Sequence, residues 1–314
     1  PPEAAICSRR KDIARARLAL AGCLVPLHCL LDINQPLQKQ MAGLPWPCVI
    51  KPLNMSASRG VIRADSPEEF VIACERLRSI IAESQGDFER NHILVEHYID
   101  GIEIAYEGFL RNGELETITI FDKPDPLTGP YFEETIYVTP SALTDELQQH
   151  LKQVIQKACK AYGLVTGAIH AECRIDSNKE IWILEIASRT IGGDCARMLD
   201  NENFNIEELA ILLAINQPIE VKMPEQARGV MMIPIKKPGL LRRVEGLLQA
   251  RKIEYIDSID IAISEGHELI PLPEGNQYLG YIFASGDTAE EVTAAIRKAY
   301  THLDFITAPV FKII

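Results

Sequence analysis

Two glutamates stand inside a segment that otherwise has the residue pattern of buried β-strands. Residues 170–189 read HAECRIDSNKEIWILEIASR, with Glu172 in the first strand-like run and Glu185 in the second. Successive side chains of a strand point to opposite faces, so each run has an apolar face and a mixed face. The apolar face carries Ile169, Ala171, Cys173, Ile175, Trp182, Leu184 and Ile186, and the mixed face carries His170, Glu172, Arg174, Ile183, Glu185 and Ala187. The pattern predicts a β-hairpin with both glutamates on one face.

A two-residue turn at Asn178 and Lys179 would place Glu172 directly opposite Glu185. Their Cβ atoms would then lie roughly 5 Å apart, and the two charges would repel by roughly 3 kcal/mol at an effective dielectric constant near 20. A shared proton, Arg174 or a hard cation such as Mg²⁺ would offset this repulsion. The competing interpretation is a solvated polar face with a chance pairing. A bulge or an odd-length loop would break the pairing.

Length and charge narrow the class of protein. The 314 residues are 47% hydrophobic and 24% charged, which is enough to bury a substantial core in two or three globular units. The net charge of -12 argues against binding to nucleic acid or an anionic membrane, because both depend on Lys and Arg. Eight scattered cysteines without a CxxC spacing indicate reduced core residues of a cytoplasmic protein.

Capping residues locate the expected helices. Ser66, with Pro67 at the first helical position and Glu69 three residues later, predicts a capping box. Thr144 is expected to start a second helix, which Gly163 ends. Further helices are expected over 12–22, from Asn205 to about 216, over 239–250, and after a cap formed by Asp287 and Glu290.

Strand-like runs fill the segments between these helices. Short strands are expected at 48–51 and 61–64, and the runs 92–99 and 102–110 predict a hairpin around the turn Asp100-Gly101. After a boundary near 216, further strands at 229–235, 253–263 and 278–285 indicate a separate small α+β unit. The expected domains are 1–44, a remnant of an N-terminal region with a linker helix, then 45–216 and 217–314.

A loop near the start of the chain suits phosphate groups. Neither GxxxxGK[ST] nor GxGxxG occurs, so the two common nucleotide motifs do not apply. In KPLNMSASRGV, Lys51 leaves a strand, and the loop from Ser56 through Ser58 to Gly60 offers hydroxyl and amide donors for phosphates. An ordinary surface loop has the same composition, so the composition alone does not distinguish a phosphate-binding loop from a surface loop.

Several motifs together resemble one enzyme family. CVIKP, SASRGV, ILVEHYIDGIE and GAIHAE...ILEIASR occur in the order and approximate spacing of the ATP-grasp enzymes. FDKPDPLTGPYFEETIYVTPS and IASRTIGG are most similar to carboxylate-amine ligases of the L-amino acid ligase and carnosine synthase type. The resemblance covers about residues 9–200, and the C-terminal unit more loosely. It implies an α+β ATP-grasp fold, in which two α/β lobes with antiparallel sheets grip ATP, plus a small C-terminal α+β domain.

The resemblance assigns nucleotide contacts by position. It implies that Lys11 and Lys51 hold the ATP phosphates, although Lys11 also fits an ordinary surface lysine. Glu96 would receive the adenine amino group, the backbone from His97 to Ile99 would line the base, and Glu103 would hold the ribose hydroxyls. An ordinary polar hairpin is the alternative for these residues.

The same resemblance makes Glu172 and Glu185 the ligands of Mg²⁺ or Mn²⁺, and Arg189 the cation facing the reacting acyl group. One position departs from the family pattern. Many ATP-grasp enzymes have an asparagine where this chain has Ala187, which implies either a single metal ion or two ions bridged by Glu185.

Three further residues are candidates for substrate contacts. His170, expected opposite Ala187, either partly fills the gap left by the missing asparagine or is an ordinary packed or solvated side chain. Glu133 and Glu134 follow a Pro/Gly-rich loop and could recognise a substrate amine, or could simply face solvent.

The implied activity is an ATP- and Mg²⁺-dependent ligase that joins a carboxylate, such as an amino acid, to an amine through an acyl phosphate. An ATP-grasp carboxylase or formyl-type transferase would share the same nucleotide residues, and a non-catalytic nucleotide-binding domain is the alternative from another class. Family members usually carry an α/β domain before the ATP-grasp region, and we expect this chain to lack it. The expected partners are small-molecule carboxylates and amines, with a homodimer as the default assembly and no nucleic acid or membrane.

Overall fold

Two units, each built from three stretches of the chain, make up the fold. The computed structural model describes residues 1–202, 204–218, 221 and 225–310. The first unit contains residues 1–117, 126–133 and 143–189, and the second unit contains 118–125, 134–142 and 190–314, where described. The predicted ranges 1–44, 45–216 and 217–314 remain a prediction, since the units interleave along the sequence.

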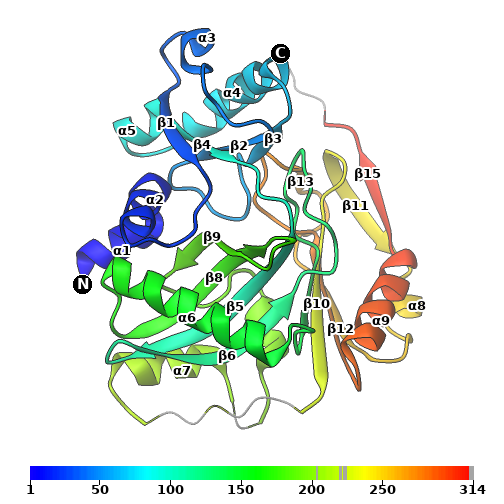
Figure 1. Ribbon diagram of the computed structural model, residues 1–314. Helices are drawn as coiled ribbons and strands as arrows, with labels where there is room; N and C mark the ends of the chain where they lie inside the picture. The colour runs from blue at the N-terminus through cyan, green and yellow to red at the C-terminus, as the bar shows by residue number, and fades with distance from the viewer. Residues whose placement is uncertain (203, 219–220, 222–224, 311–314) are drawn as a thin grey trace. The chain divides into compact units, whose positions relative to one another are not determined.

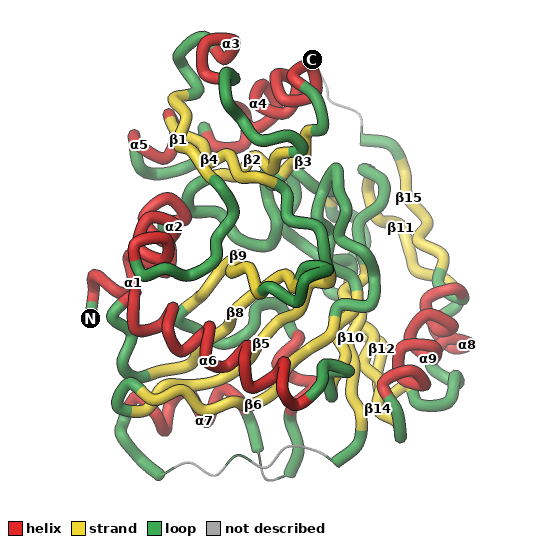
Figure 2. Tube along the Cα trace, viewed as in Figure 1, coloured by secondary structure: helices red, strands yellow, loops and turns green. Residues whose placement is uncertain are grey.

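The first unit contains a four-stranded antiparallel sheet in the order β1-β4-β2-β3, surrounded by α3, α4 and α5 (Figure 2). The elements are α3 (Leu37–Gln40), α4 (Pro67–Ile81), α5 (Asp87–Asn91), β1 (His28–Asp32), β2 (Cys48–Pro52), β3 (Ile62–Ala64) and β4 (His92–His97). Helix α4 packs Phe70, Cys74 and Leu77 against the sheet. The Ser66 cap is confirmed, because its side chain accepts a hydrogen bond from the Glu69 amide. The reciprocal half of the predicted capping box differs, because the Glu69 carboxylate accepts from the Asp65 amide.

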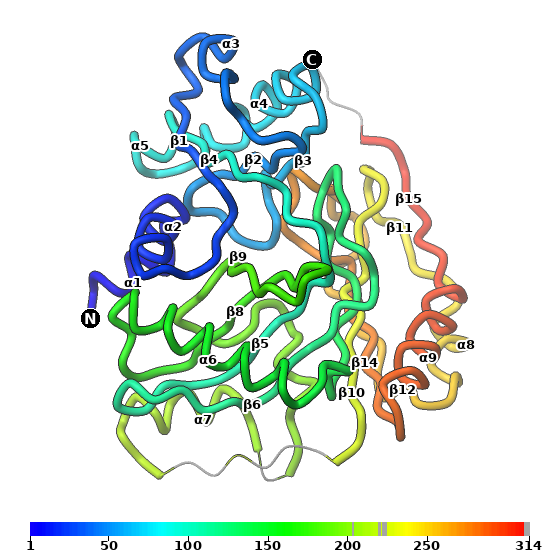
Figure 3. The backbone as a smooth tube through the Cα atoms, viewed as in Figure 1, coloured from blue at the N-terminus to red at the C-terminus, as the bar shows by residue number. Residues whose placement is uncertain are grey.

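The rest of the first unit is a second antiparallel sheet that includes β5 (Ile102–Arg111), β8 (Gly167–Ile175) and β9 (Ile181–Ala187). Helix α6 (Asp145–Tyr162) lies over this sheet, and the N-terminal helices α1 (Pro2–Arg9) and α2 (Lys11–Leu20) lie next to α6 and β9 (Figures 1 and 3). Thr144 caps α6, and Gly163 ends it in the left-handed conformation, as expected.

The expected hairpin of 92–99 with 102–110 is wrong. Strand β4 pairs with β1 and β2, whereas β5 pairs with β8. Both edges of β4 are therefore occupied, and the linker of residues 98–101 carries the chain from one sheet to the other. Gly101 allows this passage, because its φ of 141° brings the chain so close to the Ile175 carbonyl that a Cβ would lie 2.3 Å from that oxygen.

The β8–β9 hairpin pairs Glu172 with Glu185 and His170 with Ala187, so the predicted pairing is confirmed. The turn has three residues between Asp176 and Glu180, not two, and Lys179 adopts a left-handed conformation there. A three-residue turn shifts the register by one position. A β-bulge at Leu184 shifts it back.

The bulge changes which face two neighbouring side chains occupy. Ile183 lies opposite Cys173 and Trp182 lies opposite Arg174. Directly opposite residues share a face, so Ile183 belongs with the apolar residues and Trp182 with the polar ones, the reverse of the prediction. The predicted pairing of Glu172 with Glu185 is still correct, because both residues lie beyond the bulge, where the register is restored.

The second unit contains strands in the order β12-β14-β10-β7-β6 and a three-stranded sheet β13-β11-β15. Strand β6 (Glu114–Asp122) starts in the first unit and ends in the second. The remaining elements are β7 (Ile136–Thr139), the 3₁₀ helix η1 (Cys195–Leu199), α7 (Ile206–Ala214), β10 (Ala227–Ile233), β11 (Gly239–Glu245), α8 (Leu247–Ala250), β12 (Ile256–Ile261), β13 (Glu268–Leu269), β14 (Gly280–Gly286), α9 (Ala289–Thr301) and β15 (Asp304–Ala308).

Two local predictions for this unit need correction. The expected helix over 239–250 is strand β11 followed by one short turn of helix, because β11 pairs with β13 and β15, which are distant in sequence. The cap of α9 is Thr288 with Glu291, one residue later than the expected Asp287 and Glu290. All eight cysteines are free, as predicted. Within the described part of the chain, every helix is too short or too polar to span a lipid bilayer.

The capping box of α9 predicts a measurable loss of stability. The Thr288 hydroxyl accepts from the Glu291 amide at 3.2 Å, and the Glu291 carboxylate accepts from the Thr288 amide at 3.1 Å. Thr288→Ala should lower the free energy of unfolding of the second unit by about 1 kcal/mol. The loss in free energy of unfolding is measured by urea unfolding, with hydrogen exchange of the α9 amides as the readout. Thr301→Ala, at the other end of α9, is the matched control, and an equal loss in both variants would contradict the assignment.

Candidate active site

The facing carboxylates of Glu172 and Glu185 each have a cationic or basic neighbour. The Lys11 ammonium lies 3.3 Å from Glu185 Oε2, and His170 Nε2 lies 3.4 Å from Glu172 Oε1. Both carboxylates remain partly open to solvent, with 25% of the Glu172 side chain and 30% of the Glu185 side chain exposed. Two accessible carboxylates paired on a sheet are a donor set that fits a hard divalent cation.

His170 is a buried member of this group. Its Nδ1 atom bonds to Glu107, a fully buried carboxylate on β5, and its other ring nitrogen faces Glu172. Burial alone would lower the pKa of His170, but the two carboxylates raise it to about 10. His170 lies opposite Ala187, so a packed imidazole stands across from the position that departs from the expected family pattern.

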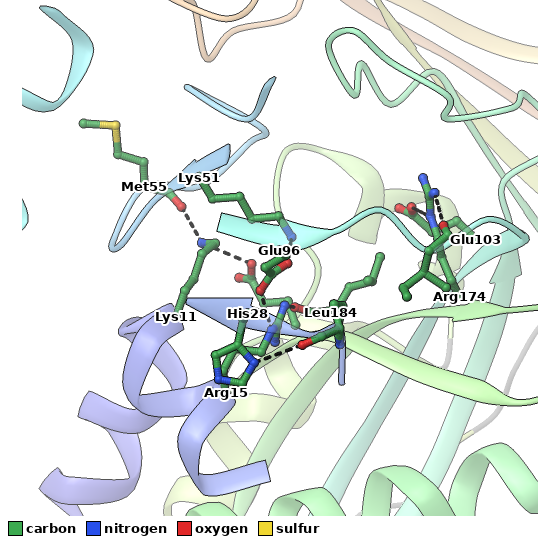
Figure 4. A network of polar contacts seen from close by, with 12 residues as sticks. Lys11, Arg15, His28, Lys51, Met55, Glu96, Glu103, Arg174 and Leu184 are labelled. Atoms are coloured by element: carbon green, nitrogen blue, oxygen red, sulfur yellow. Dashed lines mark hydrogen bonds and ion pairs between the residues drawn. The ribbon is translucent and has the colours of Figure 1, made fainter. Parts of the chain in front are cut away.

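Lys11 belongs to the site and is not a free surface lysine. Its ammonium donates to the Met55 carbonyl at 2.8 Å as well as lying beside Glu185 (Figure 4). Its backbone amide donates to the Leu53 carbonyl. The start of α2 is thereby attached to the loop that follows β2, and the contact of Lys11 with ATP phosphates stays a prediction.

Lys51 and Glu96 form a second charged group together with Arg15 (Figure 4). Lys51 Nζ lies 2.6 Å from Glu96 Oε2, and Arg15 Nε lies 2.5 Å from Glu96 Oε1. Burial would raise the pKa of Glu96, but the two cations lower it to about 2. Burial lowers the pKa of Lys51. Both Glu96 oxygens are therefore occupied by cations of the chain, while its predicted contact with the adenine amino group stays a prediction.

Arg15 is a site residue that the sequence analysis missed. It is 1% exposed, and besides Glu96 it donates through Nη2 to the Leu184 carbonyl at 2.5 Å. A signal was available, because Arg15 follows Lys11 by four residues in a helix and so lies on the same helix face.

The linker and Glu103 are held by Arg174, which is 3% exposed. Its guanidinium donates to Glu103 at 2.9 Å, to the Ile99 carbonyl at 2.6 Å and to the Leu127 carbonyl at 2.5 Å (Figure 4). Arg174 therefore does not neutralise the facing glutamates, which was one of the expected alternatives. It fixes instead the residues predicted to line the base and bind the ribose.

A groove of about 1120 Å³ runs along the linker. Its walls include His97, Tyr98 and Ile99, which are the predicted base-lining residues, and the Trp182 ring. Lys51, Glu172 and Glu185 are outside its lining. The groove thus adjoins the predicted base contacts but not the charged groups.

The loop from Ser56 to Gly60 has two different parts. Ser56 is exposed and Ser58 is half-buried, so the two hydroxyls stay candidates for phosphate contacts. Gly60 is buried, and a Cβ there would lie 2.8 Å from Leu77 and 3.2 Å from Pro52. With a φ of 73°, Gly60 is required by packing of the loop against α4 and β2.

The remaining predicted residues lie at the ends of elements. Arg189 is exposed two residues after β9, and Glu133 is half-buried in the first unit. Glu134 belongs to the second unit, where Lys123 Nζ lies 2.6 Å from its carboxylate and Tyr137 donates to it at 2.7 Å. The roles of Arg189, Glu133 and Glu134 stay predictions.

Comparison with known proteins identifies two domains in this chain. Residues 44–198 match the model of the ATP-grasp domain, and residues 231–308 match L-amino acid ligase C-terminal domain 2. Alanine–anticapsin ligase of Bacillus subtilis (strain 168) is 31% identical over 205 residues, which are 60% of this chain and 43% of that protein. D-alanine–D-alanine ligase B of Pseudomonas syringae pv. tomato is 28% identical over 168 residues, 52% of this chain and 49% of that protein.

The solved structures agree on the fold. L-amino acid ligase from Bacillus licheniformis superposes with a TM-score of 0.84 at 24% identity, covering 98% of this chain and 75% of that one. The chain spans less than half the length of the first curated relatives, 43% in each. It nevertheless matches both domain models in order. The chain therefore contains an ATP-grasp domain over residues 44–198, followed by an L-amino acid ligase C-terminal domain 2 over residues 231–308.

Proposed function

We propose that this chain is an ATP- and Mg²⁺-dependent ligase that joins a carboxylate, such as an amino acid, to an amine and releases ADP and phosphate. The observation that carries the proposal is the facing pair Glu172 and Glu185 with Lys11 beside it. The ligase names of the curated relatives support the reaction type.

In the first half-reaction, a carboxylate oxygen of the substrate attacks the γ-phosphorus of ATP. The bond from that phosphorus to the β–γ bridging oxygen breaks, and ADP leaves. Such a transfer depends on positioning and charge neutralisation more than on covalent help. Lys11 and Lys51 supply two positive charges for the phosphates, and the loop with Ser56 and Ser58 supplies hydroxyl donors.

Glu172 and Glu185 would hold the metal ion. A bound Mg²⁺ supplies Lewis-acid stabilisation of phosphoryl oxygens. Lys11 has two partners in the structure, Glu185 and the Met55 carbonyl. An arriving phosphate would take over the ammonium, which leaves Glu185 free to act as a ligand.

In the second half-reaction, the amine nitrogen attacks the acyl carbon of the acyl phosphate. Inorganic phosphate leaves with the bonding electrons, and the amine loses a proton. We assign Arg189 the role of stabilising the developing oxyanion, because a nearby positive charge lowers the energy of such an anion in many acyl transfers. Glu133 and Glu134 are the candidates for recognition of an amine.

The second candidate function is a nucleotide-binding domain without catalysis. Ala187 favours it, because alanine offers no metal ligand at the position where the family resemblance implies asparagine, and the residue opposite is the buried His170.

The metal site predicts a selective loss of activity. Glu185→Gln removes one anionic ligand, so ATP turnover with Mg²⁺ and pooled amino acids should fall at least about 100-fold. Glu180→Gln, an exposed glutamate at the turn of the same hairpin, is the matched control and should keep wild-type turnover. Full activity in Glu185→Gln would exclude this metal site. Wild-type protein that binds Mg·ATP without turnover would favour the non-catalytic candidate.

The substrate class separates the ligase from its enzymatic rivals. We expect ADP and phosphate release to be stimulated by pooled amino acids or dipeptides and not by bicarbonate or formate. Mass spectrometry should detect a new amide whose mass is the sum of two substrates minus water. Stimulation by bicarbonate or formate alone would instead assign a carboxylase or a formyl-type transferase.

A further inference from the structure

The buried arginine Arg15 contacts the metal site indirectly, through the backbone of β9. Its Nη2 donates to the Leu184 carbonyl at 2.5 Å, and Leu184 is the bulged residue directly before Glu185. Its Nε holds Glu96 at 2.5 Å. One guanidinium therefore joins helix α2, strand β4 and the bulge of β9.

The bulge decides on which face Glu185 lies. From the turn to Cys173 the register pairs Ile175 with Ile181 and Cys173 with Ile183. Continued without a bulge, that register would place Glu185 opposite Ala171, on the apolar face of the hairpin. With the bulge, Glu185 lies opposite Glu172. The metal pair thus exists only while Leu184 is held out of register.

A bulged residue leaves the ladder, and its polar backbone groups need other partners. Two neighbouring backbone groups at this edge of β9 have hydrogen-bond partners in α2 and in the segment after α2. The Leu184 carbonyl accepts from the Arg15 guanidinium, and the Leu24 carbonyl accepts from the Ile183 amide. A hydrogen bond from a charged donor is stronger than a neutral one, so Arg15 is the stronger of the two contacts.

We propose that Arg15 is a positioning residue for the metal site, because it holds the Leu184 bulge that brings Glu185 opposite Glu172. This inference rests on the proposed function for the metal itself. Neutralising Glu96 is a separate task, which any cation at this position would perform. The two tasks can be distinguished, because the ammonium of a lysine keeps the charge but cannot contact both Glu96 and the Leu184 carbonyl as a guanidinium does.

The test compares full-length wild type with Arg15→Lys, using Mn²⁺ alone as the probe. Electron paramagnetic resonance gives the Mn²⁺ dissociation constant, and hydrogen exchange gives the protection of the peptide covering 181–187. We expect Arg15→Lys to weaken Mn²⁺ binding at least about tenfold and to speed exchange of that peptide, with circular dichroism and exchange in α9 unchanged. Arg10→Met, which removes an arginine paired with Asp12 and Glu89, is the control and should match wild type.

Wild-type Mn²⁺ affinity and wild-type exchange in Arg15→Lys would overturn the inference. If Arg15→Lys does not fold, Arg15→Met removes the guanidinium and leaves Glu96 paired with Lys51, and it should fold with the same two losses. Absence of Mn²⁺ binding in wild type would refute the proposed metal site. The role of Arg15 would still be decided by exchange over 181–187, where faster exchange supports it and unchanged exchange refutes it.

Discussion

Side chains alternate along a strand, so one inserted residue reverses every facing assignment beyond it. The β8–β9 hairpin contains two such shifts, a three-residue turn and the bulge at Leu184, and they cancel. The proposed metal pair depends on this cancellation, because it places Glu185 across from Glu172 and Ala187 across from His170. A turn is determined locally, whereas the bulge depends on a contact from α2, so the site combines information from distant parts of the chain.

Each of three carboxylates of the site has a basic side chain beside it before any ligand binds. Glu96 has Arg15 and Lys51, Glu185 has Lys11, and Glu172 has His170. Leaving the buried Glu96 carboxylate without a partner would cost several kcal/mol. Under the proposed function, ATP phosphates would take over the ammonium groups of Lys11 and Lys51, and Glu185 would then be available to hold a metal ion. Such an exchange keeps charges compensated throughout binding.

The starts of three helices could be predicted from the sequence, because capping residues mark them locally. Ser66, Thr144 and Asn205 each cap a helix where predicted. The facing glutamates were also predictable from alternation, although the prediction reached the right pair through the wrong turn.

The two wrong secondary-structure predictions share a physical cause, which is that long-range partners override local pattern. Asp100-Gly101 is a good turn signal, yet β4 pairs with strands 40 or more residues earlier in the chain. Residues 239–250 have helical spacing, but β15 recruits them into a sheet. Arg174 could not be assigned to Glu103, nor Arg15 to Leu184, because neither contact leaves a trace in the spacing of nearby residues.

The C-terminal half depends on strand β7, which lies outside the matched C-terminal domain. The matched C-terminal domain begins at residue 231, but β10 pairs on one side with β14 and on the other with β7, which comes from residues 136–139. A chain cut before β10 would expose the edge of the apolar run Val230–Ile233, and such an edge is a template for aggregation. The C-terminal half is therefore not a transferable module. Recombination or domain exchange within the family has to move the segment 134–142 along with it.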